Sequence, residues 1–336
     1  MTKIKKSGWL LLGVLVLIGA CGGPIKDYDY VPFQPTTYFL PSQSATIEGM
    51  QVAYVEAGPA GAPGLIFIHG WLGNLGNWRW NVPAFSDRYH VLALDLPGFG
   101  NSDKADRDLT LELYAKVVKG LMDQKGLRKA TLVGNSMGGE VAALVALRYP
   151  DNVDKLVLVD SAGLMQTPLP MRLAAWHTNR IADWIVHRVQ KRAQGQDSSQ
   201  IYSALHERIF NPKRLRQRQV AFDLKNPNVV ETMDSTCRYY STLIKNREFE
   251  WHVKDALRAF RSLTDTSLEH LLGAVKAPTL IVWGDHDQLI PPKFAELFHH
   301  GIAGSRVVLI KDAGHIPMIE KPEEFNKALG DFLAGV

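Results

Sequence analysis

The chain has 336 residues, of which 46% are hydrophobic and 21% are charged, an ordinary balance for a globular protein. This composition excludes intrinsic disorder, a collagen-like fibre and a disulfide scaffold, and the length suits one α/β body with insertions. The 38 basic and 34 acidic residues give a net charge of +4. Three of the positive charges, Lys3, Lys5 and Lys6, lie at the N-terminus, and the remaining basic residues nearly balance the acidic ones. We therefore expect no nucleic-acid partner.

The N-terminal segment has the pattern of an export signal. Basic residues at 3–6 precede an apolar run of 12 residues at 9–20. A membrane-spanning helix needs about 20 residues, whereas this length is typical of the apolar region of a signal peptide. The run ends in Gly19 and Ala20, directly before Cys21, and this ending resembles the lipobox of bacterial lipoproteins. The resemblance implies that residues 1–20 are removed and that Cys21 carries the lipid.

The lipobox implies a protein that is exported and anchored by lipid to a bacterial membrane. Several acyl chains anchor a protein stably, whereas a single chain does not. Gly22 in place of Asp after the cysteine implies sorting to the outer membrane if the cell is Gram-negative. The alternative is an ordinary signal peptide cut nearby, with Cys21 incidental. The other cysteine, Cys237, is expected to be a buried apolar residue without a disulfide partner.

Residues 21–44 are rich in proline and predict a tether between membrane and body. Their aromatic residues offer the alternative that this stretch packs on the body. A hairpin is expected next, over 45–57. Continuous apolar runs that end in glycine or polar residues predict strands at 64–68, 91–94, 130–133, 156–159, 280–283 and 307–310. Helices are expected over 109–125, 137–148, 292–300 and 322–333. Strands of this kind, separated by helices, are typical of an α/β fold with a mostly parallel sheet covered on both faces.

The regular alternation of strands and helices is interrupted between about residues 163 and 272. This stretch has helical periodicity without a strand-like run, so we expect a helical cap, 164–272, inserted into a core of 45–163 and 273–336. Residues 164–268 hold 17 basic and 10 acidic residues. The apolar face around Trp184 and Ile185 is expected either to pack or to line an acyl pocket.

The segment Gly134-Asn135-Ser136-Met137-Gly138 carries the strongest chemical signal in the sequence. It follows a predicted strand and begins a predicted helix, and in that context the glycines permit a tight turn that exposes the serine hydroxyl. Ser136 is therefore the predicted nucleophile. A serine hydroxyl needs an adjacent base. His315 is the only histidine in a loop after the final predicted strand, which makes it the predicted base.

A third group must hold the histidine in the right tautomer. Asp287 and Asp285 both follow the strand at 280–283, and Asp160 ends the strand at 156–159. Asp287 lies on the side of its loop nearer the next helix, so it is the favoured acid, with Asp160 and Asp285 as alternatives. Carbonyl attack also requires an oxyanion hole.

The backbone N–H groups of Met137, directly after the nucleophile, and of Trp71, in the loop after an earlier strand, are the expected oxyanion-hole donors. The neighbouring His69 is expected to brace its loop, and Asp95 to stabilise a turn. No segment of the sequence has the spacing of a metal site, a P-loop or a complete dinucleotide fingerprint, so no metal and no cofactor are expected.

Together these segments resemble the α/β-hydrolase superfamily over about residues 47–336. The matching segments are 69–71, 95–100, 134–139, 283–287 and 314–315. Residues 134–139 and 159–163 look like those of bacterial family V lipases and are similar to those of the membrane-anchored monoacylglycerol lipases of animals. Dehalogenases and epoxide hydrolases of this fold place an aspartate at the position of Ser136, which counts against both activities.

The resemblance implies an α/β-hydrolase fold with an inserted helical cap and a Ser-His-Asp triad. The expected activity is a serine esterase or lipase acting through an acyl-enzyme on a small-molecule or lipid ester. A basic cap keeps open a second activity, cofactor-independent hydrolysis of a carbon–carbon bond in diketone acids. A third reading is a binding protein on a hydrolase fold without catalysis. The sequence leaves the oligomeric state open.

Overall fold

The computed structural model describes residues 35–104, 107–164, 177–210, 222–223 and 225–336. The predicted signal peptide, Cys21 and the first part of the tether lie outside the described residues. So do two parts of the predicted cap, 165–176 and 211–221. Within the described ranges, no helix is both long and apolar enough to cross a membrane.

The core is an eight-stranded sheet in the order β1-β2-β4-β3-β5-β6-β7-β8. The strands are β1 Gln43–Ile47, β2 Met50–Ala57, β3 Gly64–Ile68, β4 His90–Leu94, β5 Ala130–Asn135, β6 Val153–Val159, β7 Thr279–Gly284 and β8 Arg306–Ile310. β2 pairs antiparallel with both β1 and β4, and every other neighbouring pair is parallel. The predicted mostly parallel sheet is confirmed. Because β3, β5, β6 and β7 are parallel neighbours, their carboxyl ends lie along the same edge of the sheet.

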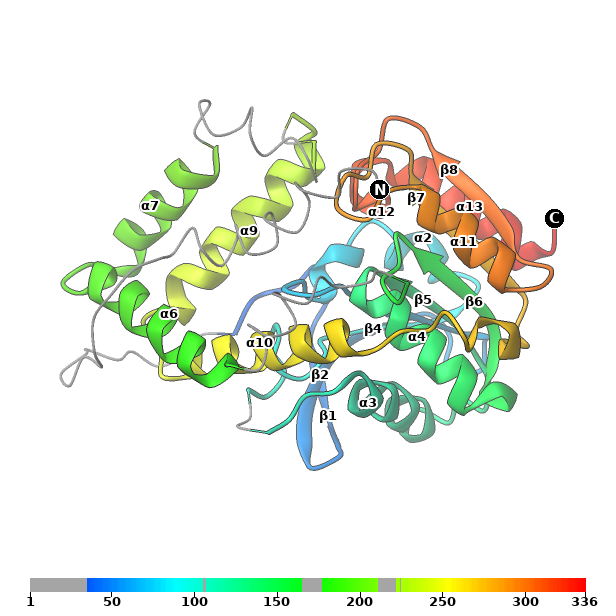
Figure 1. Ribbon diagram of the computed structural model, residues 1–336, viewed down its shortest axis with the longest axis horizontal. Coiled ribbons are helices and arrows are strands. Elements are labelled where there is room, and N and C mark those ends of the chain that lie inside the picture. The colour runs from blue at the N-terminus through cyan, green and yellow to red at the C-terminus, as the bar shows by residue number, and fades with distance from the viewer. Residues whose placement is uncertain (1–34, 105–106, 165–176, 211–221, 224) are drawn as a thin grey trace.

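Helices cover both faces of the sheet. Successive residues of a strand point to opposite faces, and in the central strand β3 both sets of side chains are apolar and buried. In β3, Ile66 and Ile68 belong to an apolar cluster that also contains residues of α3 Leu111–Gln124, α4 Met137–Arg148 and α11 Lys293–Gly301. Figure 1 shows these helices beside the sheet. Leu65 and Phe67 pack on the other face with α2 Val82–Phe85 and α13 Pro322–Ala334. All five residues of β3 are buried, which explains why the sequence shows an uninterrupted apolar run there.

In its described residues, the chain between β6 and β7 forms helices joined by turns and contains no strand. It contains α6 Thr178–Ala193, α7 Ser198–Phe210, α9 Pro227–Leu243 and α10 Glu248–Asp265. Apolar residues of α6, α9 and α10 form a separate cluster that includes Ile185, Leu243 and Val253, with Trp184 packed against it. Ile185 is 1% exposed, so the apolar face that we expected either to pack or to line a pocket contributes here to packing within the cap. α10 contacts α6 within the cap and α3 in the core (Figure 1).

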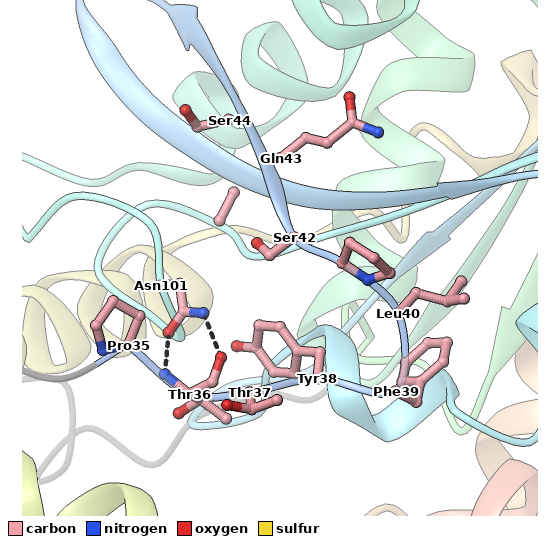
Figure 2. Close-up of a pocket in the computed structure, with 12 residues that line it drawn as sticks. Pro35, Thr36, Thr37, Tyr38, Phe39, Leu40, Ser42, Gln43, Ser44 and Asn101 are labelled. Carbon is pink, nitrogen blue, oxygen red and sulfur yellow. Dashed lines mark hydrogen bonds between the residues drawn. The ribbon is translucent and has the colours of Figure 1, made fainter.

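The described end of the predicted tether packs on the body. Residues 35–42, which we call the strap, bring Tyr38, Phe39 and Leu40 against one apolar face of the sheet. The Thr36 N–H donates to Asn101 Oδ1, and Asn101 Nδ2 donates to the Thr36 carbonyl, both at 2.8 Å (Figure 2). The strap borders an open cavity of about 660 Å³ on the body surface. For these residues the structure agrees with the alternative that the aromatic side chains pack on the body.

Candidate active site

The turn between β5 and α4 holds Ser136 in a backbone conformation that few side-chain-bearing residues adopt, with φ 55° and ψ −119°. Two glycines make the turn possible. A methyl group in place of the Gly134 hydrogen would lie 2.1 Å from the carbonyl oxygen of Gly138, and one on Gly138 would lie 2.3 Å from that of Ile68. The Ser136 N–H donates to the Val159 carbonyl at 2.9 Å, which ties the turn to the end of β6. The strain therefore serves to expose one hydroxyl above the sheet.

His315 and Asp287 form a buried hydrogen-bonded pair. His315 Nδ1 lies 2.8 Å from Asp287 Oδ2. The other oxygen, Asp287 Oδ1, accepts the N–H groups of Leu289 at 2.7 Å and Ile290 at 3.0 Å. The carboxylate is thereby fixed in its loop. It holds the imidazole in the tautomer with a proton on Nδ1, which leaves Nε2 available as a base.

The two alternative acids have other partners. The Asp285 side chain is partly exposed, and its Oδ1 lies 3.7 Å from Nδ1 of the exposed His286. Asp160 is fully buried, and its Oδ1 accepts the Gly284 N–H at 3.0 Å. Among the described residues, Asp287 is the only carboxylate that accepts a hydrogen bond from His315.

The loop that carries His315 is bound to the turn that carries Ser136. Asn135 Nδ2 donates to the carbonyls of Val159 at 3.2 Å and of His315 at 3.1 Å. In this part of the chain no hydrogen bond joins the Ser136 hydroxyl to His315. Such contacts often tighten only when substrate binds. Sequence reasoning did not single out Asn135, although it occupies the variable position of the Gly-x-Ser motif.

Glu320 is a second positioning residue that sequence reasoning missed. Its Oε2 accepts the Gly314 N–H at 3.0 Å, directly before His315. It lies in the short helix α12 Pro317–Glu320 and is 3% exposed. Burial raises the pKa of Glu320. A lone glutamate five residues after the histidine gives no recognisable pattern in one sequence.

The expected oxyanion-hole residues lie beside the nucleophile. A methyl group on Gly70 would approach the Ser136 Cβ to 3.1 Å, so the loop after β3 touches the nucleophile turn. Within the described structure, the backbone N–H groups of Trp71 and Met137 have no hydrogen-bond partner. This arrangement is compatible with donation to an oxyanion.

The Trp71 side chain links this loop to the cap. Its Nε1–H donates to the carbonyl of Ala256 in α10 at 2.7 Å. Its ring packs on Phe260, with centroids 5.2 Å apart. The position of α10 and the position of the oxyanion loop are therefore coupled.

His69 braces the same loop from within the core. Its Nδ1 lies 2.7 Å from the Gly70 carbonyl, and its Nε2 lies 3.0 Å from the Leu96 N–H. These partners fix a neutral ring with the proton on Nδ1. Burial lowers the pKa of His69 to about 4, which is consistent with a neutral ring.

Asp95 stabilises the neighbouring turn. Its oxygens accept the N–H groups of Leu75 and Asn101 and the hydroxyl of Tyr38, each at 2.7 Å. Burial raises the pKa of Asp95 to about 6 despite these donors. The strap thus supplies a hydrogen bond to a carboxyl group that holds the oxyanion-loop region together.

A single group of residues in the described ranges brings oxygen and nitrogen donors close enough for a metal ion. It consists of Asp160, Asp287 and His315, whose donor atoms lie within 4.8 Å of one another. Carboxylates and imidazole are a donor set that metals accept. In this structure the imidazole Nδ1 is already bonded to Asp287.

The chain belongs to the α/β hydrolase fold family, whose pattern it matches over residues 63–322. It is 30% identical over 331 residues to the dihydrolipoyllysine-residue acetyltransferase component of the acetoin cleaving system of Cupriavidus necator, covering 97% of this chain and 79% of that one. It is 30% identical over 282 residues to Lipase 1 of Psychrobacter immobilis, covering 82% and 78%. It is 29% identical over 308 residues to 2-hydroxy-6-oxo-6-phenylhexa-2,4-dienoate hydrolase of Comamonas testosteroni, covering 89% and 96%.

Solved structures resemble most of this chain. A bacterial membrane phospholipase A matches with a TM-score of 0.66 and 27% identity, covering 88% of this chain and 86% of that one. These comparisons confirm the predicted α/β-hydrolase fold and the resemblance to lipases.

Proposed function

We propose that this hydrolase is a serine esterase or lipase that cleaves carboxylic esters through an acyl-enzyme. The observation that carries the proposal is the buried Asp287–His315 pair, bonded at 2.8 Å, beside the strained turn of Ser136. A nucleophile, a base held in one tautomer and two N–H groups are the parts that acyl transfer requires. The similarity to Lipase 1 and to a membrane phospholipase A supports an ester substrate.

In the proposed reaction, His315 Nε2 takes the hydroxyl proton of Ser136 as the oxygen attacks the ester carbonyl. The tetrahedral oxyanion accepts hydrogen bonds from the N–H groups of Trp71 and Met137. His315 then gives its proton to the departing alcohol, which leaves an ester on Ser136. Water, deprotonated by His315, attacks that ester and releases the acid. Asp287 stabilises the imidazolium in both halves without itself accepting a proton.

The proposed location is a bacterial membrane surface, reached by export and by lipid attached to Cys21. The basic stretch, the apolar run of 12 residues and the small residues before Cys21 support it. A lipid anchor would place the enzyme at the surface where lipid esters reside. A small-molecule or lipid ester is the expected substrate.

Hydrolysis of a carbon–carbon bond is the second candidate activity. It is supported by the Comamonas relative, whose name gives a 2-hydroxy-6-oxo-dienoate, an acid that also carries a ketone, as the compound hydrolysed. The test is a turnover profile of the purified protein on esters of increasing acyl length beside a diketone acid. Turnover of the esters, abolished in Ser136→Ala together with labelling by an organophosphonate, is the expected result. Turnover of the diketone acid alone would reject the ester proposal in favour of the second candidate.

A further inference from the structure

Asp160 is a buried acid that the proposed reaction does not use. It follows β6 with φ 43°, a left-handed conformation that is uncommon for residues other than glycine. Its N–H donates to the Val282 carbonyl at 3.0 Å, and its Oδ1 accepts the Gly284 N–H at 3.0 Å. Asp160 thereby joins the ends of β6 and β7, and its carboxylate lies within 4.8 Å of that of Asp287.

The second oxygen of Asp160 has no donor within the described structure. Asp160 Oδ2 is buried, and a carboxylate oxygen of Asp160 lies within 4.8 Å of one of Asp287, so two ionised acids would bring two acceptors together. A buried acceptor without a donor is costly, and two buried like charges at this separation repel each other. One proton on Asp160 removes both problems, since its hydroxyl can then donate to the Asp287 carboxylate.

The distribution of donors indicates which acid holds the proton. Asp287 accepts two backbone N–H groups and the imidazole, whereas Asp160 accepts one N–H group. The third carboxyl group nearby, that of Glu320, adds negative potential if it ionises. Burial, followed by the charge of Asp287, raises the pKa of Asp160 well above its usual range. Of the two acids, Asp160 is therefore the one whose surroundings favour a bound proton.

We propose that Asp160 is a positioning residue that carries a proton and donates it in a hydrogen bond to Asp287, which holds that carboxylate in line with His315. The inference rests on the proposed function, because Asp287 and His315 matter to turnover only if they serve Ser136. In this arrangement four groups fix Asp287: two backbone N–H groups, the imidazole and the Asp160 hydroxyl.

The variants Asp160→Ala and Asp160→Asn test whether Asp160 acts as a neutral hydrogen-bond donor or as a charged acid. Alanine removes the donor, and we expect kcat/KM to fall about ten- to hundredfold, mostly in kcat, as for other groups that orient a catalytic residue. Asparagine keeps an oxygen for the Gly284 N–H and offers an N–H to Asp287, so it should restore most of that loss. Asparagine as damaging as alanine would overturn the proposal, because an ionised Asp160 would then be required.

The pH profile supplies a readout that mere packing would not change. The groups that face Asp160 and can titrate are Asp287, His315 and Glu320. Without the Asp160 donor, Asp287 attracts the imidazolium proton more strongly, so the acidic limb of kcat/KM should move to higher pH in Asp160→Ala. It should return toward the wild-type position in Asp160→Asn. An unmoved limb in the alanine variant would contradict donation to Asp287.

Infrared difference spectroscopy tests the proton directly and needs no turnover. At pH 7 the wild-type minus Asp160→Asn spectrum should show the carbonyl band of a protonated carboxyl group. A carboxylate band in its place would overturn the proposal. This comparison does not use Asp160→Ala, so it remains decisive even if thermal unfolding shows that the alanine variant is not folded. If no ester is hydrolysed and Ser136 takes no organophosphonate label, the proposed function fails, while the infrared band still decides the protonation of Asp160.

Discussion

The hydrogen bond from Tyr38 to Asp95 offers a quantitative test of how the strap contributes to stability. Tyr38→Phe removes the hydroxyl that donates to Asp95 Oδ2 at 2.7 Å and leaves the ring in place. A hydrogen bond to a charged group contributes about 1.5–3 kcal/mol, and one between neutral groups about 1 kcal/mol. Because Tyr38 is partly exposed, we expect a value at the lower end of the charged range.

The loss should depend on pH because Asp95 titrates. Its pKa of about 6 in the folded protein lies above the value of about 3.9 in an unfolded chain. Between these values the folded protein holds a proton that the unfolded chain has released, so the contribution of Asp95 to stability falls as the pH rises from the lower value to the higher one. The Tyr38 hydroxyl lowers the pKa of Asp95, and its removal extends that fall. We expect Tyr38→Phe to lower the free energy of unfolding by about 1 kcal/mol at pH 5 and about 1.5–2 kcal/mol at pH 8.

Urea unfolding at both pH values measures this difference, with Tyr54→Phe as the matched control. The Tyr54 hydroxyl donates to Gln43 Oε1 at 2.9 Å and also lies beside Lys125. An amide is neutral and a lysine is charged at both pH values, so the loss should be the same at pH 5 and pH 8. An equal loss at the two pH values for Tyr38→Phe would refute the linkage to Asp95. No loss at either pH would show that the strap does not stabilise the body.

Three further predictions concern the cap, the anchor and the donor cluster. Ile185→Ala should lower the free energy of unfolding by about 2–5 kcal/mol, because it opens a cavity in the cap cluster; a loss below about 0.5 kcal/mol in urea unfolding would mean that the cap adds little to global stability. Cys21→Ser should abolish labelling by a fatty-acid analogue and leave unprocessed precursor, and an unlabelled, freely released wild-type protein would contradict the lipoprotein proposal. Dialysis against a chelator should leave ester hydrolysis unchanged, because Asp287 already occupies His315 Nδ1; activity lost to the chelator and restored by a divalent metal would assign a cation to the Asp160–Asp287–His315 cluster.

Local patterns were sufficient for the core because its strands are buried on both faces. The run at 64–68 is apolar at every position for this reason, and the predicted strand coincides with β3. The Ser136 turn was equally readable, since Gly134 and Gly138 stand where a side chain would strike backbone. Such requirements act between residues that are neighbours in the chain. They therefore leave a trace that a single sequence shows.

Contacts between distant segments were decided only by the tertiary structure. The sequence offered Asp160, Asp285 and Asp287 as partners for His315, and three-dimensional geometry alone shows that Asp287 is within hydrogen-bond distance. The pairing of Tyr38 with Asp95 spans 57 residues. The sequence predicted that Asp95 stabilises a turn, but no local pattern indicated Tyr38 as its partner. The sequence by itself thus determined the parallel sheet, the cap insertion and the serine turn, which follow from periodicity and local sterics. The tertiary structure decided that Asp287 is the acid bonded to His315 and that Tyr38 bonds to Asp95. These pairings depend on burial and on distances between segments far apart along the chain.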